Sequence, residues 1–156
     1  MGSAFAYFVD TEVSTANSFE MGTWAVDADG GGNTVVHTFN NLTAGTGGTN
    51  YWTVTNTGTV PAYVDMSINV AGTGAGSPGD FLLAHIYVAG YVGDIYGSAA
   101  SPLPISAAGR NYDLNLVLEG GENLVIALDW TVNDAYEPDA FDEVVFTMSF
   151  NIQPAP

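Results

Sequence analysis

The chain has 156 residues, and 47% of them are hydrophobic, which is enough for one domain with a buried core and argues against disorder. Its charge is one-sided: 17 acidic residues stand against a single arginine, Arg110, and no lysine, for a formal net charge of −16. Nucleic acids and anionic membrane surfaces are bound through Lys and Arg, so the composition argues against both as partners. The absence of cysteine excludes disulfides and thiolate chemistry.

The N-terminal segment is apolar on both faces. Residues 4–9 read Ala-Phe-Ala-Tyr-Phe-Val, and the polar run Asp10-Thr11-Glu12 follows directly. An extended strand with two apolar faces must be buried on both sides, so it is either a central strand of its own domain or a strand given to another molecule. The opening residues are also similar to the end of a signal-peptide hydrophobic region, and we expect a signal peptide upstream and secretion.

Further along the chain, alternation of apolar and polar residues predicts strands. After a possible short helix near 14–21, weaker strand patterns cover 23–28, 34–39, 50–57, 81–89 and 112–118, and strong ones cover 60–70, 124–132 and 144–152. Glycine-rich turns separate them, and we find no linker or repeat. Many short strands with such turns predict one all-β domain, a sandwich or jelly roll.

Candidate catalytic and metal sites are few. The two histidines, His37 and His85, fall on separate predicted strands without an H-E-x-x-H pair, and we interpret both as structural. The turn Asp27-Ala28-Asp29-Gly30-Gly31-Gly32-Asn33 resembles the start of a calcium loop, with Asp27, Asp29 and Asn33 as possible ligands, but solvated carboxylates are the favoured reading. Asn41-Leu42-Thr43 is a sequon, so Asn41 is a possible glycosylation site.

Several segments together resemble the TasA/camelysin family of secreted biofilm-matrix fibre proteins, which includes the archaeal bundling pilins. Residues 7–19, Tyr-Phe-Val-Asp-Thr-Glu-Val-Ser-Thr-Ala-Asn-Ser-Phe, followed by Gly22-Thr23-Trp24, are similar to the family's mature N-terminus. Residues 40–45 and 52–64 resemble its middle, and Leu128-Asp129-Trp130 with the strand 146–153 resembles its end. One departure is Ala44, where the family usually has proline.

The resemblance implies a secreted jelly-roll domain that polymerises head to tail by donor-strand complementation and bundles laterally. We then expect residues 1–12 to be the donor strand and 13–156 the jelly-roll domain. The donor residues would be Ala4, Phe5, Ala6, Tyr7, Phe8 and Val9, and the acceptor groove would include Val64, Met66, Ile68, Phe146, Met148 and Phe150.

Two other functions stay open. Camelysins have been described as metalloproteases, so the chain is alternatively a secreted protease that uses His37, His85 and a carboxylate, although no zinc-ligand set is recognisable. The third hypothesis is a calcium-dependent surface adhesin or S-layer domain. We expect no enzyme activity and, apart from possible Ca²⁺, no cofactor.

Overall fold

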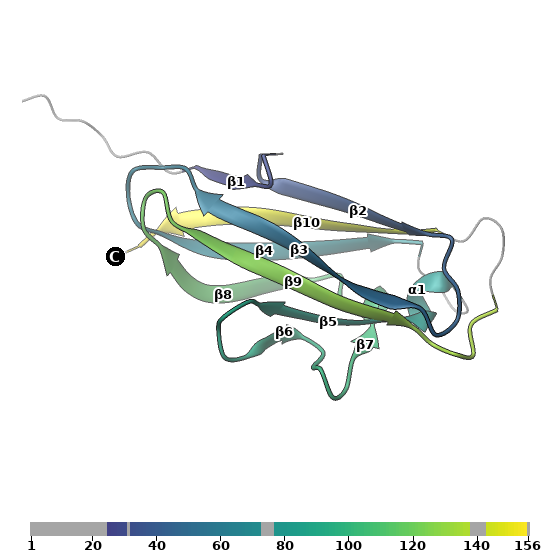
Figure 1. Cartoon of the computed structure of the whole chain (residues 1–156). Coiled ribbons are helices and arrows are strands. Elements are labelled where there is room, and N and C mark those ends of the chain that lie inside the picture. The colour runs from purple at the N-terminus through teal and green to yellow at the C-terminus, as the bar shows by residue number, and fades with distance from the viewer. Residues whose placement is uncertain (1–24, 31, 73–76, 138–142, 156) are drawn as a thin grey trace, which may run out of the picture.

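Two antiparallel sheets packed face to face make up the part of the chain that the structure describes, which is residues 25–30, 32–72, 77–137 and 143–155 of the computed structural model (Figure 1). The strands are β1 (Val26–Ala28), β2 (Thr34–Asn40), β3 (Gly47–Asn56), β4 (Ala62–Ala71), β5 (Leu82–Val88), β6 (Asp94–Tyr96), β7 (Leu103–Pro104), β8 (Asn111–Leu118), β9 (Asn123–Val132) and β10 (Glu143–Pro154). A one-turn helix α1 (Pro78–Phe81) and a 3-10 turn (Ile105–Ala107) are the helical elements described. None of the described helices has the length and apolarity that a membrane crossing requires.

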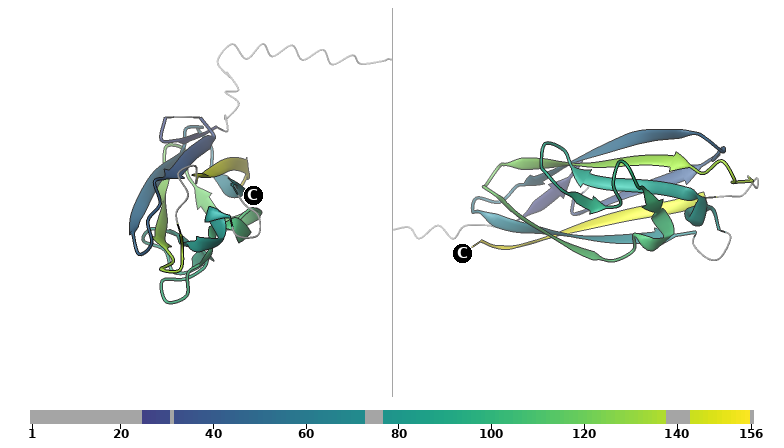
Figure 2. Two further views of the ribbon diagram at one scale, coloured as in Figure 1. Left: turned by 90° about the vertical axis from the view of Figure 1, so that its right-hand side faces the viewer. Right: turned by 90° about the horizontal axis from the view of Figure 1, so that it is seen from below.

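Strand order defines the two layers. The β9 sheet has the order β1-β3-β9-β5-β6, with β7 pairing β5 beside β6, and the β10 sheet has the order β2-β10-β4-β8. Successive strands from β2 to β5, and again from β8 to β10, cross from one sheet to the other. The two layers form an elongated sandwich, with the β5–β7 segment along one side (Figure 2).

The strong alternation in the sequence marks the strands at the centre of this sandwich. The predicted strands at 60–70, 124–132 and 144–152 are confirmed as β4, β9 and β10, and their apolar faces are buried in one common core. The first of them begins later than predicted, at Ala62, because Pro61 has no N–H to donate to a ladder. The core is sealed by aromatic contacts between the sheets, such as Trp52 stacked on Phe146 with ring centroids 6.2 Å apart.

The weaker patterns are confirmed as strands in β1, β2, β3, β5 and β8. Sequence reasoning missed β6, β7 and α1, which are two to four residues long and too short to show a period. The possible helix near 14–21 and the start of the predicted strand 23–28 lie outside the described residues.

One buried polar side chain, Asn56, ties the end of β3 to the end of β8. Its amide nitrogen donates to the carbonyl oxygens of Val60 at 2.8 Å and Leu118 at 3.0 Å, and its amide oxygen accepts from Gly58 N–H at 3.0 Å. The side chain is fully buried. Two of these bonds hold Gly58 and Val60 in the β3–β4 connection, and the third holds the last residue of β8, so the buried amide of Asn56 fixes the connection against β8.

Candidate functional site

The side chains predicted to line an acceptor groove form the inner face of the β10 sheet. All six are 5% exposed or less: Val64, Met66, Ile68, Phe146, Met148 and Phe150. They belong to the same core cluster as the inner side chains of the β9 sheet, which therefore covers them. A neighbour's strand would reach them only by displacing that sheet. The predicted donor residues 4–9 lie outside the described residues, so their role stays a prediction.

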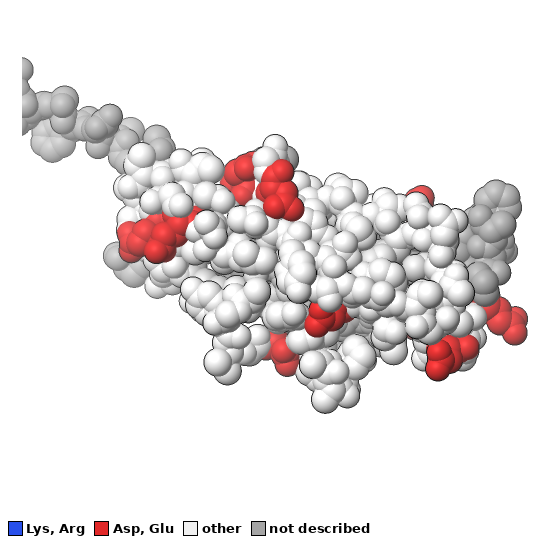
Figure 3. Space-filling view, viewed as in Figure 1, with Lys and Arg blue, Asp and Glu red and all other residues white. Residues whose placement is uncertain are grey.

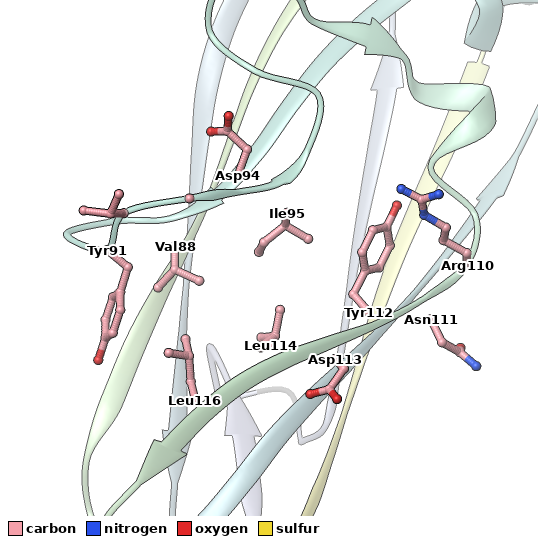
Figure 4. Close-up of a pocket in the computed structure, with 12 residues that line it drawn as sticks. Val88, Tyr91, Asp94, Ile95, Arg110, Asn111, Tyr112, Asp113, Leu114 and Leu116 are labelled. Carbon is pink, nitrogen blue, oxygen red and sulfur yellow. The ribbon is translucent and has the colours of Figure 1, made fainter.

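An open groove lies elsewhere, between β8 and the β5–β6 connection (Figure 4). We call it the β6–β8 groove; its volume is about 510 Å³, and its apolar lining consists of Val88, Tyr91, Val92, Ile95, Leu114 and Leu116. It separates the last strand of the β10 sheet from the last strand of the β9 sheet. The two sheets therefore part along this side and leave apolar side chains between them accessible.

The groove has two walls, one formed by β8 and the other by the turn after β5, and both carry apolar side chains that solvent can reach. On the β8 wall, Leu114 and Leu116 point toward the β9 sheet but remain only half-buried. The pairing of β8 with β4 contains a bulge. Asp113 pairs with Asp65 and Leu116 pairs with Val64, so Leu114 and Asn115 between them have no direct partner on β4. On the other wall, Tyr91 and Val92 sit in the tight turn after β5, where they are 55% and 107% exposed.

The single cation of the chain stands at one end of this groove. The Arg110 guanidinium carbon lies 5.0 Å from the ring centroid of Tyr112 and 5.9 Å from that of Tyr96. Burial raises the pKa of the Tyr112 hydroxyl, and Arg110 partly offsets this rise. The ion pairs found in the described part of the chain all involve His85, so Arg110 has no carboxylate within 4.0 Å there.

The side-chain oxygens of the possible calcium ligands already accept hydrogen bonds within the protein, from backbone N–H groups at Asp27 and Asp29 and from a hydroxyl at Asn33. The two carboxylate oxygens of Asp27 accept from Gly30 N–H at 2.9 Å and from Gly32 N–H at 2.8 Å. Asp29 accepts from Thr53 N–H at 2.9 Å, and Asn33 accepts from the Thr34 hydroxyl at 3.3 Å. This turn thus uses its carboxylates to close itself onto β3, which is a structural role.

The two histidines lie on different sheets. His85 is buried on the outer face of the β9 sheet, with Nε2 at 2.6 Å from Asp94 Oδ1 and Nδ1 at 3.5 Å from Asp129 Oδ2. The two carboxylates meet opposite ring nitrogens and do not converge on one point. His37, on β2, packs edge-on against Phe39 and Trp52, and burial lowers its pKa. Among the described residues no group of three or more His, Cys, Asp or Glu side chains is placed to hold a metal.

The sequon asparagine is accessible. Asn41 follows β2 directly, is exposed, and has a left-handed backbone with φ of 52°. The next residue, Leu42, is buried in the core and anchors this turn. A glycan on Asn41 would therefore project from the end of β2 without disturbing the core.

One wall of the groove is marked in the sequence by a weaker apolar alternation, at residues 112–118, which we predicted only as a strand. Tyr112, Leu114, Leu116 and Leu118 repeat with the period of a strand, and Arg110 precedes them. Alternation shows which side chains face inward, but only the packing of the neighbouring sheet shows that three of these four stay half-exposed.

Comparison with known proteins places the chain in a family. Residues 1–90 match the model of the camelysin metallo-endopeptidase family. Neither the curated proteins nor the solved structures include a match. Because the matched segment is more than half of the 156 residues, the chain belongs to the camelysin family, as the motifs of its sequence predicted.

Proposed function

We propose that this protein is a structural subunit of an extracellular filament and polymerises with copies of itself by donor-strand complementation. The supporting observation is a complementary pair of features within one chain. Residues 4–9 read Ala-Phe-Ala-Tyr-Phe-Val, which in an extended strand would be apolar on both faces, and the described domain has an apolar groove beside a strand that ends its sheet. Strand addition to such an edge supplies main-chain hydrogen bonds and side-chain pockets together.

The connectivity supports a jelly roll as the finer description of the fold. One sheet has the strand order β2-β10-β4-β8, and the other contains the order β3-β9-β5-β6. Most consecutive strands along the chain therefore lie in opposite sheets. Two nested Greek keys have this pattern. A sandwich of this kind leaves strand edges on both long sides, which is where a donor strand can be added.

A chain that donates one surface and accepts on another forms an open polymer. Donor segment and acceptor edge are different parts of the molecule, so the contact is heterologous and repeats head to tail without closing. We place the product outside the cell, with a signal peptide removed before assembly.

We further propose that the protein is not a hydrolase, although its family is described as a metallo-endopeptidase. Catalytic zinc is held by three protein ligands, commonly two or three of them histidine. The chain has two histidines and no cysteine, and His37 and His85 lie on different sheets. The residues described therefore do not fit a zinc centre.

Proteolysis is tested on casein with and without a chelator. We expect no cleavage by a clean preparation, and unchanged filaments from the chain that carries His37→Ala and His85→Ala. Chelator-sensitive cleavage that the double variant lacks would overturn this part of the proposal.

Lateral association of filaments should depend on cations or pH. Figure 3 shows acidic side chains and no basic one on the face in view, in keeping with the net charge of −16. Like charges repel across about 8 Å at physiological ionic strength, so divalent cations or acidification should favour bundling. Turbidity across a Mg²⁺ series is the test, and equal bundling in low-salt EDTA at pH 8 would contradict it.

Electron microscopy of the purified full-length chain tests the main proposal. Phe5→Asp and Phe8→Asp should abolish or weaken filaments while the β-sheet circular dichroism stays unchanged, and Thr11→Asp, just beyond the apolar segment, is the matched control. A full-length chain that stays monomeric at high concentration, and that unfolds when Phe5 or Phe8 is replaced, would show that the segment belongs to its own sandwich.

A further inference from the structure

We propose that residues 4–9 of a neighbouring copy lie in the β6–β8 groove, antiparallel to β8, with the neighbour's Asp10 and Glu12 beside Arg110. This inference rests on the proposed function and adds to it the receiving edge and the direction of the strand. It differs from the acceptor site expected from sequence, whose side chains are buried beneath the β9 sheet.

Exposed apolar surface favours this edge. Val92 and Tyr91 are among the most exposed large hydrophobic residues described, and both line the groove. Figure 4 shows Val88, Ile95, Leu114 and Leu116 between β8 and the β5–β6 segment, and Arg110 with Tyr112 at the opposite end from Tyr91. A strand with apolar side chains on both faces would cover both walls at once, which a strand apolar on one face would not do.

The backbone of β8 can pair with such a strand. It ends the β10 sheet and has β4 on one side only within the described residues. Its eight residues extend about 26 Å, against about 20 Å for the six donor residues. Because the bulge at Leu114–Asn115 interrupts the edge, we expect pairing on 111–113 and on 116–118.

Charge sets the direction. Arg110 precedes the first residue of β8. Asp10 and Glu12 follow the last donor residue at a spacing of two, which would put both on one face if the donor strand continues through them. An antiparallel donor brings these acids to Arg110. A parallel donor would bring them toward Glu119 and Glu122, at the other end of β8.

The carboxylates that line the groove itself do not compete for Arg110. Asp94 Oδ1 lies 2.6 Å from His85 Nε2, and Asp113 accepts from Asn115 N–H at 3.0 Å. Arg110 contacts the rings of Tyr96 and Tyr112 and keeps donors for an incoming carboxylate. The only cation of the chain is thus placed where the proposed strand becomes acidic.

Substitutions of exposed residues in the full-length chain test the edge. Val92→Asp should raise the critical concentration for assembly about tenfold or more, because it places a charge in the groove. Val36→Asp on β2, 62% exposed at the opposite edge of the same sandwich, is the matched control and should change it less than about twofold. Equal effects of the two variants would overturn the groove assignment.

Charge reversal tests the direction. Arg110→Glu should raise the critical concentration about two- to fivefold, as expected for an exposed ion pair, and Asp10→Arg in the same chain should restore it. Failure of the second substitution to restore assembly would overturn the proposed contact.

Cross-linking locates the strand directly, since the natural chain has no cysteine. Asp10→Cys chains mixed with Asn111→Cys chains should form intermolecular disulfides under oxidation. Asp10→Cys mixed with Thr38→Cys tests the β2 edge, and Asp10→Cys mixed with Val117→Cys tests the parallel direction. Filaments that link through Thr38 or Val117 would overturn this inference and leave the proposed function standing. Monomers at every concentration, or a disulfide within one doubly substituted chain at high dilution, would overturn both.

Discussion

Replacing the buried amide of Asn56 by a carboxylate of the same shape should destabilise the domain in a pH-dependent way. Asn56→Asp removes the two N–H donors that meet the carbonyl oxygens of Val60 and Leu118 at 2.8 and 3.0 Å. It puts an acceptor against two acceptors in a site without solvent. Only the bond accepted from Gly58 N–H survives.

The expected cost is large. Each of the two carbonyl oxygens loses its partner, which costs about 1–3 kcal/mol per carbonyl, for a total of about 2–6 kcal/mol at neutral pH. In the folded variant, burial and the two carbonyls raise the pKa of the new carboxyl above the ordinary value of about 3.9. A raised folded pKa means that stability is retained below that ordinary value and lost as pH rises through the folded pKa.

Urea unfolding at about pH 7.5 and pH 4.5 checks both the size and the sign. The variant should lie closest to the natural chain at the lower pH, where the protonated acid can donate to one carbonyl. Asn123→Asp, on an exposed position of β9, controls for the added charge. An Asn56→Asp protein as stable as this control at neutral pH would refute the buried hydrogen-bond network.

Three further substitutions test other parts of the structure. In Gly72→Ala the new Cβ would lie 2.2 Å from the Glu143 carbonyl oxygen. Gly121 has a similar φ but open space around it, so Gly121→Ala should lower the free energy of unfolding by only about 1–2 kcal/mol, and Gly72→Ala should lower it by clearly more. Asp27→Ala should cost about 1–3 kcal/mol, and Ca²⁺ should shift the melting temperature of neither chain; a shift that Asp27→Ala removes would restore the calcium hypothesis. Burial lowers the pKa of His37 below 6.5, so the folded chain binds this proton less readily than the unfolded chain. In urea unfolding, lowering the pH through the lowered pKa should therefore reduce the stability of the natural chain more than that of His37→Gln. An equal dependence on pH in the two proteins would contradict this.

Strong alternation predicted the centre of the fold because central strands have one fully buried face. The inner residues of β4 and β10, such as Met66 and Phe146, alternate with polar ones over most of each strand. The short strands β6 and β7 escape this reasoning, since three and two residues show no period, and their pairing with β5 depends on turns between them.

The candidate site was harder to predict than the fold. Alternation identifies inward-facing side chains, and so it selected Met148 and its neighbours, which are sealed, as readily as Leu114, which is half-exposed. The difference is set by where the opposite sheet ends. The role of Asp27 could not be predicted either, because it depends on the backbone N–H groups that the turn brings to its carboxylate. The role of His85 depends in the same way on the carboxylate of Asp94, which the fold brings to its ring.

The most direct test of self-assembly through the β8 edge is an electron cryomicroscopy map of the purified full-length chain. We expect a filament in which each subunit holds, between its β8 and its β5–β6 connection, an extended strand of the adjacent subunit. This strand would contain Phe5, Tyr7 and Phe8, and its acidic end would lie at Arg110. Particles that are single subunits, with residues 4–9 packed into their own domain, would contradict it.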